Sequence, residues 1–197
     1  MYTTNQTHPI TPEKYLEWEK EQTIKHEYMD GEVYAMAGGT ISHNDITLNI
    51  ASALKSHLRG KGCKVQMADV LVGVSQSGPF YYPDVMVSCD SQDRKSRRVM
   101  YNPCLIVEVL SPGTEAFDRG DKFKYYRRIK TLKEYVLVSA EKMNVECYRL
   151  NERDRWELIP YSVEEVTPAE TELEVEFTSV DFRCPLSLFY EDVDMLP

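Results

Sequence analysis

Long apolar segments are missing from this chain of 197 residues. No run approaches the roughly 20 apolar residues that cross a bilayer, and the opening MYTTNQTHPITPEKY has no signal-peptide core. The five cysteines include no CxxC pair and the four histidines show no HExxH spacing, so a zinc site is not expected. Scattered cysteines in odd number favour reduced thiols, and we therefore expect a cytoplasmic protein with no membrane contact.

Repeats, low-complexity segments and cofactor-binding loops are also missing, and no pattern indicates a covalent nucleophile. The composition that remains, 42% hydrophobic and 28% charged residues, is typical of an ordinary globular protein. A chain of this length can bury a sufficient core without disulfides or metals. We therefore expect one domain over residues 1–197.

The net charge of −9 is unevenly distributed along the chain. Residues 164–197 form an acidic C-terminal part with ten acids and one base, whereas the preceding residues carry equal numbers of each. Within that neutral part, residues 94–130 hold ten bases against four acids. Such a local positive field can steer a polyanion, although charge runs are also commonly just solvated surface.

Two short apolar runs, YYPDVMVS and CLIVEVLS, each contain a single carboxylate, Asp84 and Glu108 respectively. Runs of this length and composition indicate buried strands. If the strands are neighbours, both acids can project toward one point, and converging buried carboxylates suggest a divalent cation. Asp84 alone could instead be a turn or capping residue, and Glu108 could belong to a structural ion pair.

The remaining pattern predicts an α/β fold, with a mixed sheet flanked by helices. We expect helices over 11–22, 43–59 (capped by Ser42) and 117–130, a strand over 63–74, a buried strand over 134–139, and hairpins turning at Asp30–Gly31 and 151–154. The polar, basic stretch 90–98 is predicted to be poorly ordered in the absence of a polyanion. Glu32 and His43 are further candidate site residues, which could equally be a strand-end acid and a surface histidine.

Six motifs in order, DGEVYAM, SHN, YYPDVMV, VEVLSPGT, DRGDKFKYY and EYVLV, resemble the Uma-type putative restriction endonucleases of the PD-(D/E)XK nuclease superfamily. The resemblance runs from about Tyr28 to Val138. It implies a restriction-endonuclease-like core, with Asp84 and Glu108 as ligands of Mg²⁺ or Mn²⁺ and the Val109 carbonyl as a third ligand.

The chain departs from the superfamily pattern at one position. The expected lysine would lie two residues after Glu108, where the sequence has Leu110. By the resemblance, the missing ammonium would come from Lys122 on the following helix. Alternatively, the spacing allows Lys122 to be only a helix-surface partner of Asp118, one turn earlier.

The expected function is metal-dependent hydrolysis of DNA phosphodiester bonds, with homodimerisation by analogy to enzymes that cut both strands. Two alternatives remain open: a module on the same fold that binds nucleic acid or protein without cleavage, and a Mg²⁺-dependent phosphodiesterase acting on RNA. The residues expected to contact nucleic acid are Arg94, Lys95, Arg97, Arg98 and Lys124.

Overall fold

A six-stranded mixed sheet forms the centre of the computed structural model, which describes residues 2–3, 9–36, 38–162 and 173–194. Its strand order is β12 (Trp156–Ser162), β11 (Asn144–Leu150), β10 (Glu134–Ser139), β9 (Leu105–Leu110), β7 (Val85–Ser88) and β4 (Lys64–Met67). The β9 and β10 strands are parallel, and all other neighbours in this sheet are antiparallel. The predicted mixed α/β fold is therefore confirmed.

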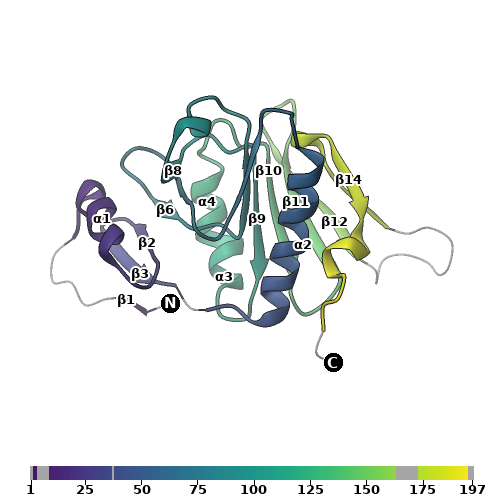
Figure 1. The fold of residues 1–197 in the computed structure, drawn as a ribbon, viewed down its shortest axis with the longest axis horizontal. Coiled ribbons are helices and arrows are strands. Elements are labelled where there is room, and N and C mark those ends of the chain that lie inside the picture. The colour runs from purple at the N-terminus through teal and green to yellow at the C-terminus, as the bar shows by residue number, and fades with distance from the viewer. Residues whose placement is uncertain (1, 4–8, 37, 163–172, 195–197) are drawn as a thin grey trace.

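Helices cover both faces of the central sheet (Figure 1). The long helix α2 (Ile41–His57) packs on one face through Ile46, Ile50 and Leu54, which contact the valines of β7 and β9. On the other face lies a helix that consists of α3 (Glu115–Phe117), a π-helical turn η3 (Asp118–Lys122) and α4 (Phe123–Tyr126). This helix is the connection between the parallel strands β9 and β10, as such a crossover requires.

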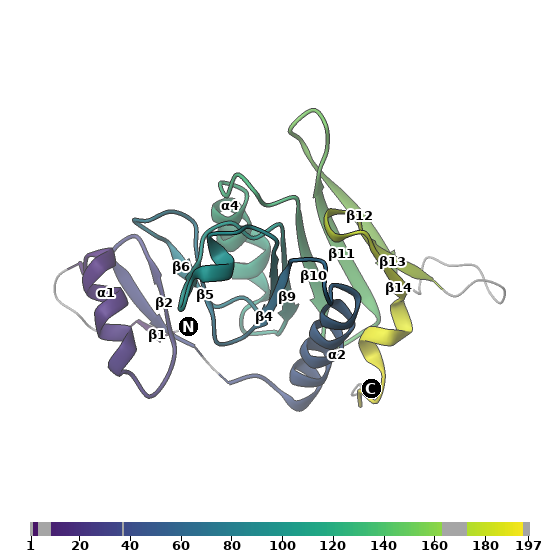
Figure 2. The ribbon, with the colours of Figure 1, turned by 45° about the horizontal axis from the view of Figure 1, so that its top comes forward.

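A second six-stranded sheet lies at the N-terminal end, with the order β1 (Tyr2–Thr3), β3 (Glu32–Ala35), β2 (His26–Met29), β6 (Phe80–Tyr81), β5 (Leu71–Gly73) and β8 (Val99–Met100). Helix α1 (Pro12–Trp18) and its extension η1 (Glu19–Glu21) pack on it through the buried Tyr15. The Asp30–Gly31 turn joins β2 to β3 as predicted, with positive φ angles at both residues. Figure 2 shows this hairpin and α1 at one end of the molecule.

Two expected strands are each broken in the structure, so that their halves join different sheets. The 63–74 segment divides into β4 and β5 at Ala68, whose φ of 48° lies outside the extended region. The 81–88 segment divides into β6 and β7 around Pro83, which cannot donate a ladder hydrogen bond. Helix α2 also begins earlier than predicted, because Thr40 and not Ser42 caps it through the His43 N–H at 3.2 Å.

The C-terminal segment packs against α2 (Figure 2). It comprises β13 (Glu174–Phe177), η5 (Thr178–Val180), β14 (Phe182–Pro185) and η6 (Leu186–Tyr190). The predicted acidic part therefore contributes apolar residues to the core, while its stretch 163–172 lies outside the described residues. Within the described ranges, no helix has the length and apolar character of a membrane span.

The expectation of reduced thiols is wrong for two of the five cysteines, since Cys63 and Cys89 form a disulfide. The antiparallel register pairs Lys64 with Ser88, which places the preceding and following cysteines opposite each other. Their separation of 26 residues in the sequence conceals this contact. Part of the argument for a cytoplasmic location is thereby lost, and that location stays a prediction.

The basic stretch 90–98 is anchored, contrary to the prediction that it lacks an anchor. It contains the short 3₁₀ turn η2 (Asp93–Lys95). The Asp93 carboxylate is buried and accepts hydrogen bonds from the Ser88 hydroxyl at 2.8 Å and from the N–H groups of Tyr101 and Asn102 at 2.9 and 2.8 Å. A segment held in this way does not need a polyanion in order to fold.

Candidate active site

Asp84, directly before β7, and Glu108, on the neighbouring strand β9, stand side by side. The β7–β9 register pairs Val85 with Val107, so that Asp84, which precedes Val85, lies opposite Glu108, which follows Val107. Two hydrogen bonds connect them: the Asp84 N–H donates to Glu108 Oε2 at 3.3 Å, and the Val109 N–H donates to Asp84 Oδ2 at 2.7 Å. Both carboxylates line one cavity of about 90 Å³, so the predicted convergence is confirmed.

Glu108 is almost completely buried, with 2% of its surface exposed. Alternation along β9 directs it, together with Ile106 and Leu110, toward the α3–α4 side of the sheet. Its Oε1 accepts a hydrogen bond from the Tyr126 hydroxyl at 2.9 Å and one from Lys122 Nζ at 3.2 Å. Burial raises the pKa of Glu108 well above its ordinary value, although the Lys122 ammonium opposes this.

The Lys122 ammonium lies at the centre of three carboxylates. Its Nζ is 3.2 Å from one oxygen each of Glu27, Glu108 and Asp118. Burial lowers the pKa of Lys122, but these acids outweigh it and raise the pKa well above the ordinary value. The side chain is therefore a buried ammonium whose charge three carboxylates stabilise.

The π-helical turn η3 carries both Asp118 and Lys122. Short π-helical turns occur frequently at functional sites, where they alter the direction of the side chains that follow. The predicted pairing of these two residues is confirmed, but both are buried, not on the helix surface as expected. Phe117 and Tyr81 cover the ammonium, each with its ring centre 5.8 Å from Nζ.

The cluster carries more negative than positive charge. Four carboxylates (Glu27, Asp84, Glu108 and Asp118) face the Lys122 ammonium and the imidazole of His43. Burial raises the pKa of Glu27 as it does that of Glu108, because removal from water disfavours the charged form of a carboxylate. Oxygen ligands with an excess negative charge fit a hard divalent cation such as Mg²⁺.

In the described part of the chain, no three His, Cys, Asp or Glu side chains are arranged to hold an ion unaided. This agrees with the usual Mg²⁺ site, which takes one or two carboxylates and completes its shell with water and substrate oxygens. Asp84 and Glu108 supply two carboxylates of this kind, and the binding of Mg²⁺ or Mn²⁺ stays a prediction.

His43 contacts Asp84 from the first turn of α2, with its Nε2 3.3 Å from Asp84 Oδ2. Burial lowers the pKa of His43, but hydrogen bonds to Asp84 and to the backbone of Val109 outweigh it and raise the pKa. The structure thus brings this candidate into the site. It also shows that the Val109 backbone, predicted as a ligand, already interacts with His43 and Asp84.

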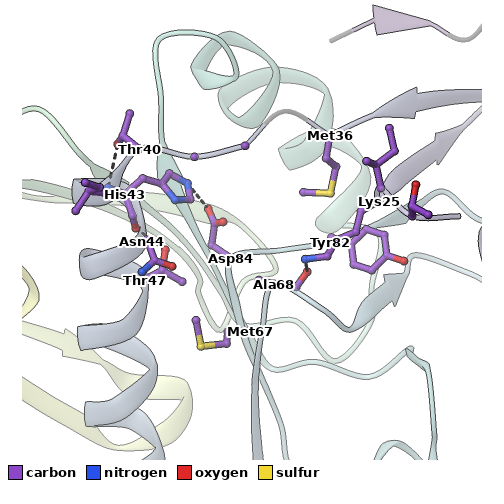
Figure 3. A pocket seen from close by; sticks show the side chains of 15 residues that line it. Lys25, Met36, Thr40, His43, Asn44, Thr47, Met67, Ala68, Tyr82 and Asp84 are labelled. Carbon is purple, nitrogen blue, oxygen red and sulfur yellow. Dashed lines mark hydrogen bonds and ion pairs between the residues drawn. The ribbon is translucent and has the colours of Figure 1, made fainter.

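A groove of about 650 Å³ leads to Asp84 and His43 (Figure 3). Its walls come from three elements: the segment before β2, the start of α2, and the Met67–Ala68 bend after β4. Lys25 is the cationic residue among those that line it, and its ammonium is paired with Asp69. Two strongly exposed apolar side chains, Ile24 (57%) and Ile41 (82%), also line the groove.

The structure does not bring Glu32 into the cavity. It is exposed on β3 and accepts a hydrogen bond from Tyr34. Lys124 is also exposed, with its Nζ 4.0 Å from Asp121.

The basic residues of the 90–98 stretch follow the far end of β7, whereas Asp84 precedes its near end. Arg94 and Arg98 donate to the backbone carbonyls of Gly62 and Leu16, at 2.9 and 3.3 Å. Lys95 and Arg97 are exposed. Nucleic-acid contact by these four residues stays a prediction.

Three residues of the cluster were not identified as site residues from the sequence: Glu27, Asp118 and Tyr126. The signal available for Glu27 was its place as an acid within HEYM, a short strand directly before a turn. Tyr126 packs on the sheet as part of the apolar cluster, and its hydroxyl also donates a hydrogen bond to Glu108. The spacing between Asp118 and Lys122 indicated that the two residues pair, but spacing alone could not indicate that the pair is buried.

The chain is similar to several known proteins. The family model of Uma2, described as "Putative restriction endonuclease", matches residues 12–186. Two uncharacterized proteins of Synechocystis are similar: slr1290 is 41% identical over 77% of this chain and 80% of its own length, and sll1609 is 31% identical over 87% and 95%. The crystal structure of a putative nuclease of the DUF820 family from Anabaena variabilis superimposes with a TM-score of 0.74 at 15% identity, covering 93% of this chain and 98% of that one.

Proposed function

Because the chain belongs to the Uma2 family of putative restriction endonucleases, we propose that it is a Mg²⁺- or Mn²⁺-dependent endonuclease that hydrolyses phosphodiester bonds in DNA. The observation that carries the proposal is the placement of Asp84, directly before β7, next to Glu108 on the adjacent strand β9 and beside the buried ammonium of Lys122. Phosphodiester hydrolysis needs a nucleophilic water and compensation of the charge that builds on the phosphate.

The Asp84 and Glu108 carboxylates, with the Val109 carbonyl, would hold the ion. When bound, the ion would polarise the phosphate and lower the pKa of a water molecule. The Val109 N–H and the His43 imidazole orient the Asp84 carboxylate, and the Tyr126 hydroxyl orients that of Glu108. Two anchored carboxylates give the preorganisation on which electrostatic catalysis depends.

Lys122 acts as a hydrogen-bond donor and a fixed positive charge. The three carboxylates around Nζ stabilise its protonated form, which suits a hydrogen-bond donor and a positive charge better than a general base. From its position beside Glu108 it can orient the attacking water or neutralise a phosphate oxygen. This assigns to Lys122 the task of the lysine that the sequence lacks at Leu110.

The groove that ends at Asp84 supplies a path for a nucleic-acid strand. Its few positive charges are compensated within the protein, and its apolar walls suit the faces of nucleobases. Homodimerisation, which would bring two such sites to the two strands of a duplex, is part of the proposal.

A cleavage assay with end-labelled DNA and RNA tests the proposal. We expect DNA cleavage with Mg²⁺ or Mn²⁺, none with EDTA, and at least about a hundredfold loss in Asp84→Asn. Asp121→Asn, which removes an exposed acid of the same type, is the matched control. Cleavage of RNA alone would replace DNA as the substrate, and no cleavage of either would favour the binding module.

A further inference from the structure

Glu27 is a buried acid that connects the N-terminal sheet to the site in the central sheet. It lies on β2 with 2% of its surface exposed. Its Oε1 accepts a hydrogen bond from the Tyr82 N–H at 3.1 Å and lies 3.2 Å from Lys122 Nζ. Since Tyr82 stands two residues before Asp84, one oxygen atom contacts both segments that carry the proposed machinery.

A second buried acid fixes the strand from which Glu27 projects. Glu19 accepts hydrogen bonds from the His26 N–H at 2.8 Å and from the Tyr82 hydroxyl at 3.1 Å. Glu19 therefore holds both His26, which precedes Glu27, and Tyr82, whose N–H donates to Glu27. This arrangement prevents Glu27 from withdrawing from Lys122.

A purely structural role would not require the charge of Glu27. The Tyr82 N–H could be satisfied by a neutral amide oxygen, whereas a buried carboxylate is costly without a compensating cation. Only the contact with Lys122 needs a negative charge, and Glu108 and Asp118 already supply two. The third carboxylate, that of Glu27, holds the ammonium from a further side, because it alone comes from the N-terminal sheet.

We infer that Glu27 is a positioning residue, which holds the Lys122 ammonium and the Tyr82–Asp84 segment in place for hydrolysis; the inference rests on the proposed function. The ammonium lies in a cage of Glu27, Glu108 and Asp118, beneath the rings of Tyr81 and Phe117. Removing one side of the cage frees the ammonium to move toward the other two acids and away from the place where substrate must bind.

The test is Glu27→Gln, which keeps an acceptor for the Tyr82 N–H and deletes the charge. The matched control is Glu32→Gln, which makes the same change at an exposed acid on the adjacent strand β3. For Glu27→Gln we expect kcat to fall by at least about tenfold, since small misplacements of a reacting group have effects of this size. KM and the Mg²⁺ dissociation constant should change by less than about twofold, because Asp84 and Glu108 remain.

A second measurement needs neither substrate nor metal. With ¹³C-labelled lysine, NMR relaxation of the Lys122 ε-methylene should show greater mobility in Glu27→Gln than in the parent or in Glu32→Gln. Parent-like kcat or parent-like Lys122 mobility in Glu27→Gln would overturn the inference. If the parent cleaves no nucleic acid, the proposed function fails, and the NMR measurement alone decides the positioning role.

A variant that fails to fold would not leave the inference undecided. Circular dichroism at the assay temperature establishes whether Glu27→Gln is folded. If it is not, Glu27→Asp replaces it, since this variant keeps the charge but withdraws it by one methylene group. The same fall in kcat and rise in Lys122 mobility are expected, and parent-like values in both measurements would overturn the inference.

Discussion

A single buried ammonium holds the candidate site together. Lys122 is 6% exposed and faces three carboxylates, so its charge stabilises the fold as well as any reaction. From the sequence, its pairing with Asp118 was expected to be an exposed contact worth only a few tenths of a kcal/mol. That expectation is wrong, because breaking a buried pair leaves uncompensated charge in the interior.

Lys122→Met keeps the stem and removes the charge. We expect a destabilisation of about 3–5 kcal/mol, which for a chain of this size lowers Tm by about 10 °C, and at least about a hundredfold loss of cleavage below that temperature. Thermal unfolding and the cleavage assay measure the two effects. Lys124→Met is the control, since Lys124 is an exposed lysine on the same helix. Parent-like cleavage by Lys122→Met would refute the assigned role.

In the absence of metal, the free energy of unfolding of Glu108→Gln should increase relative to that of the parent as pH rises. Burial raises the pKa of Glu108 in the folded protein. Between its ordinary pKa and that raised value, the folded state binds more protons than the unfolded state, so the stability of the parent falls as pH rises. Gln cannot titrate and removes this loss. Denaturant unfolding between about pH 5 and about pH 8 measures it, and an advantage that shrinks with pH would contradict the account.

At the level of residues, the sequence identified those whose chemistry is unusual for their place. Glu108 is an acid among the valines of β9, and Lys122 is a lysine beside an apolar stripe. Both features can be recognised in the amino-acid sequence. Glu27 was missed because its partner Lys122 lies far along the chain on the helix between β9 and β10, and the approach of the two sheets depends on the breaks at Ala68 and Pro83. The roles of Asp84, Glu108 and Lys122 in catalysis stay predictions.

Among the elements, the 90–98 stretch shows how a polar sequence can be ordered without apolar anchors. Three donors converge on the Asp93 carboxylate, and the Cys63–Cys89 disulfide ties the start of the stretch to β4. The composition of DSQDRKSRR indicated a solvated loop. The buried carboxylate of Asp93 forms the interior of this stretch, although a count of the composition treats Asp93 only as a polar residue.

Asp93→Ala should destabilise the protein by about 3 kcal/mol, because three donors lose their buried acceptor. Denaturant unfolding provides the measurement, and Asp121→Ala is the exposed control. If Asp93→Ala left stability unchanged, the anchor would not exist.

Across the whole molecule, the sequence predicted the order of elements and the mixed central sheet, but not the division into two large sheets. Periodicity locates strands, whereas membership of a sheet depends on where the chain bends. The expectation of one domain over residues 1–197 stays a prediction. The groove, which the sequence did not indicate, lies beside both sheets and connects to the carboxylate cavity.

The apolar walls of the groove predict how a strand is held. Replacing both Ile24 and Ile41 by Ser should raise KM for nucleic acid by about tenfold, because the apolar surface that a bound base would cover is lost. Leu158→Ser is the control, because Leu158 is 50% exposed and lies outside the groove. Tm should change little in either protein, as these side chains are already exposed. Equal KM values for the double variant and the control would exclude this groove as the path.

The central claim is that Asp84 and Glu108 together hold a divalent cation. A crystal of the parent soaked in Mn²⁺, with anomalous scattering recorded near the manganese edge, tests it most directly. The account predicts one peak in contact with an oxygen of each carboxylate, and no peak at that place in a crystal of Asp84→Asn. A parent crystal without that peak, or with manganese bound only elsewhere, would contradict it.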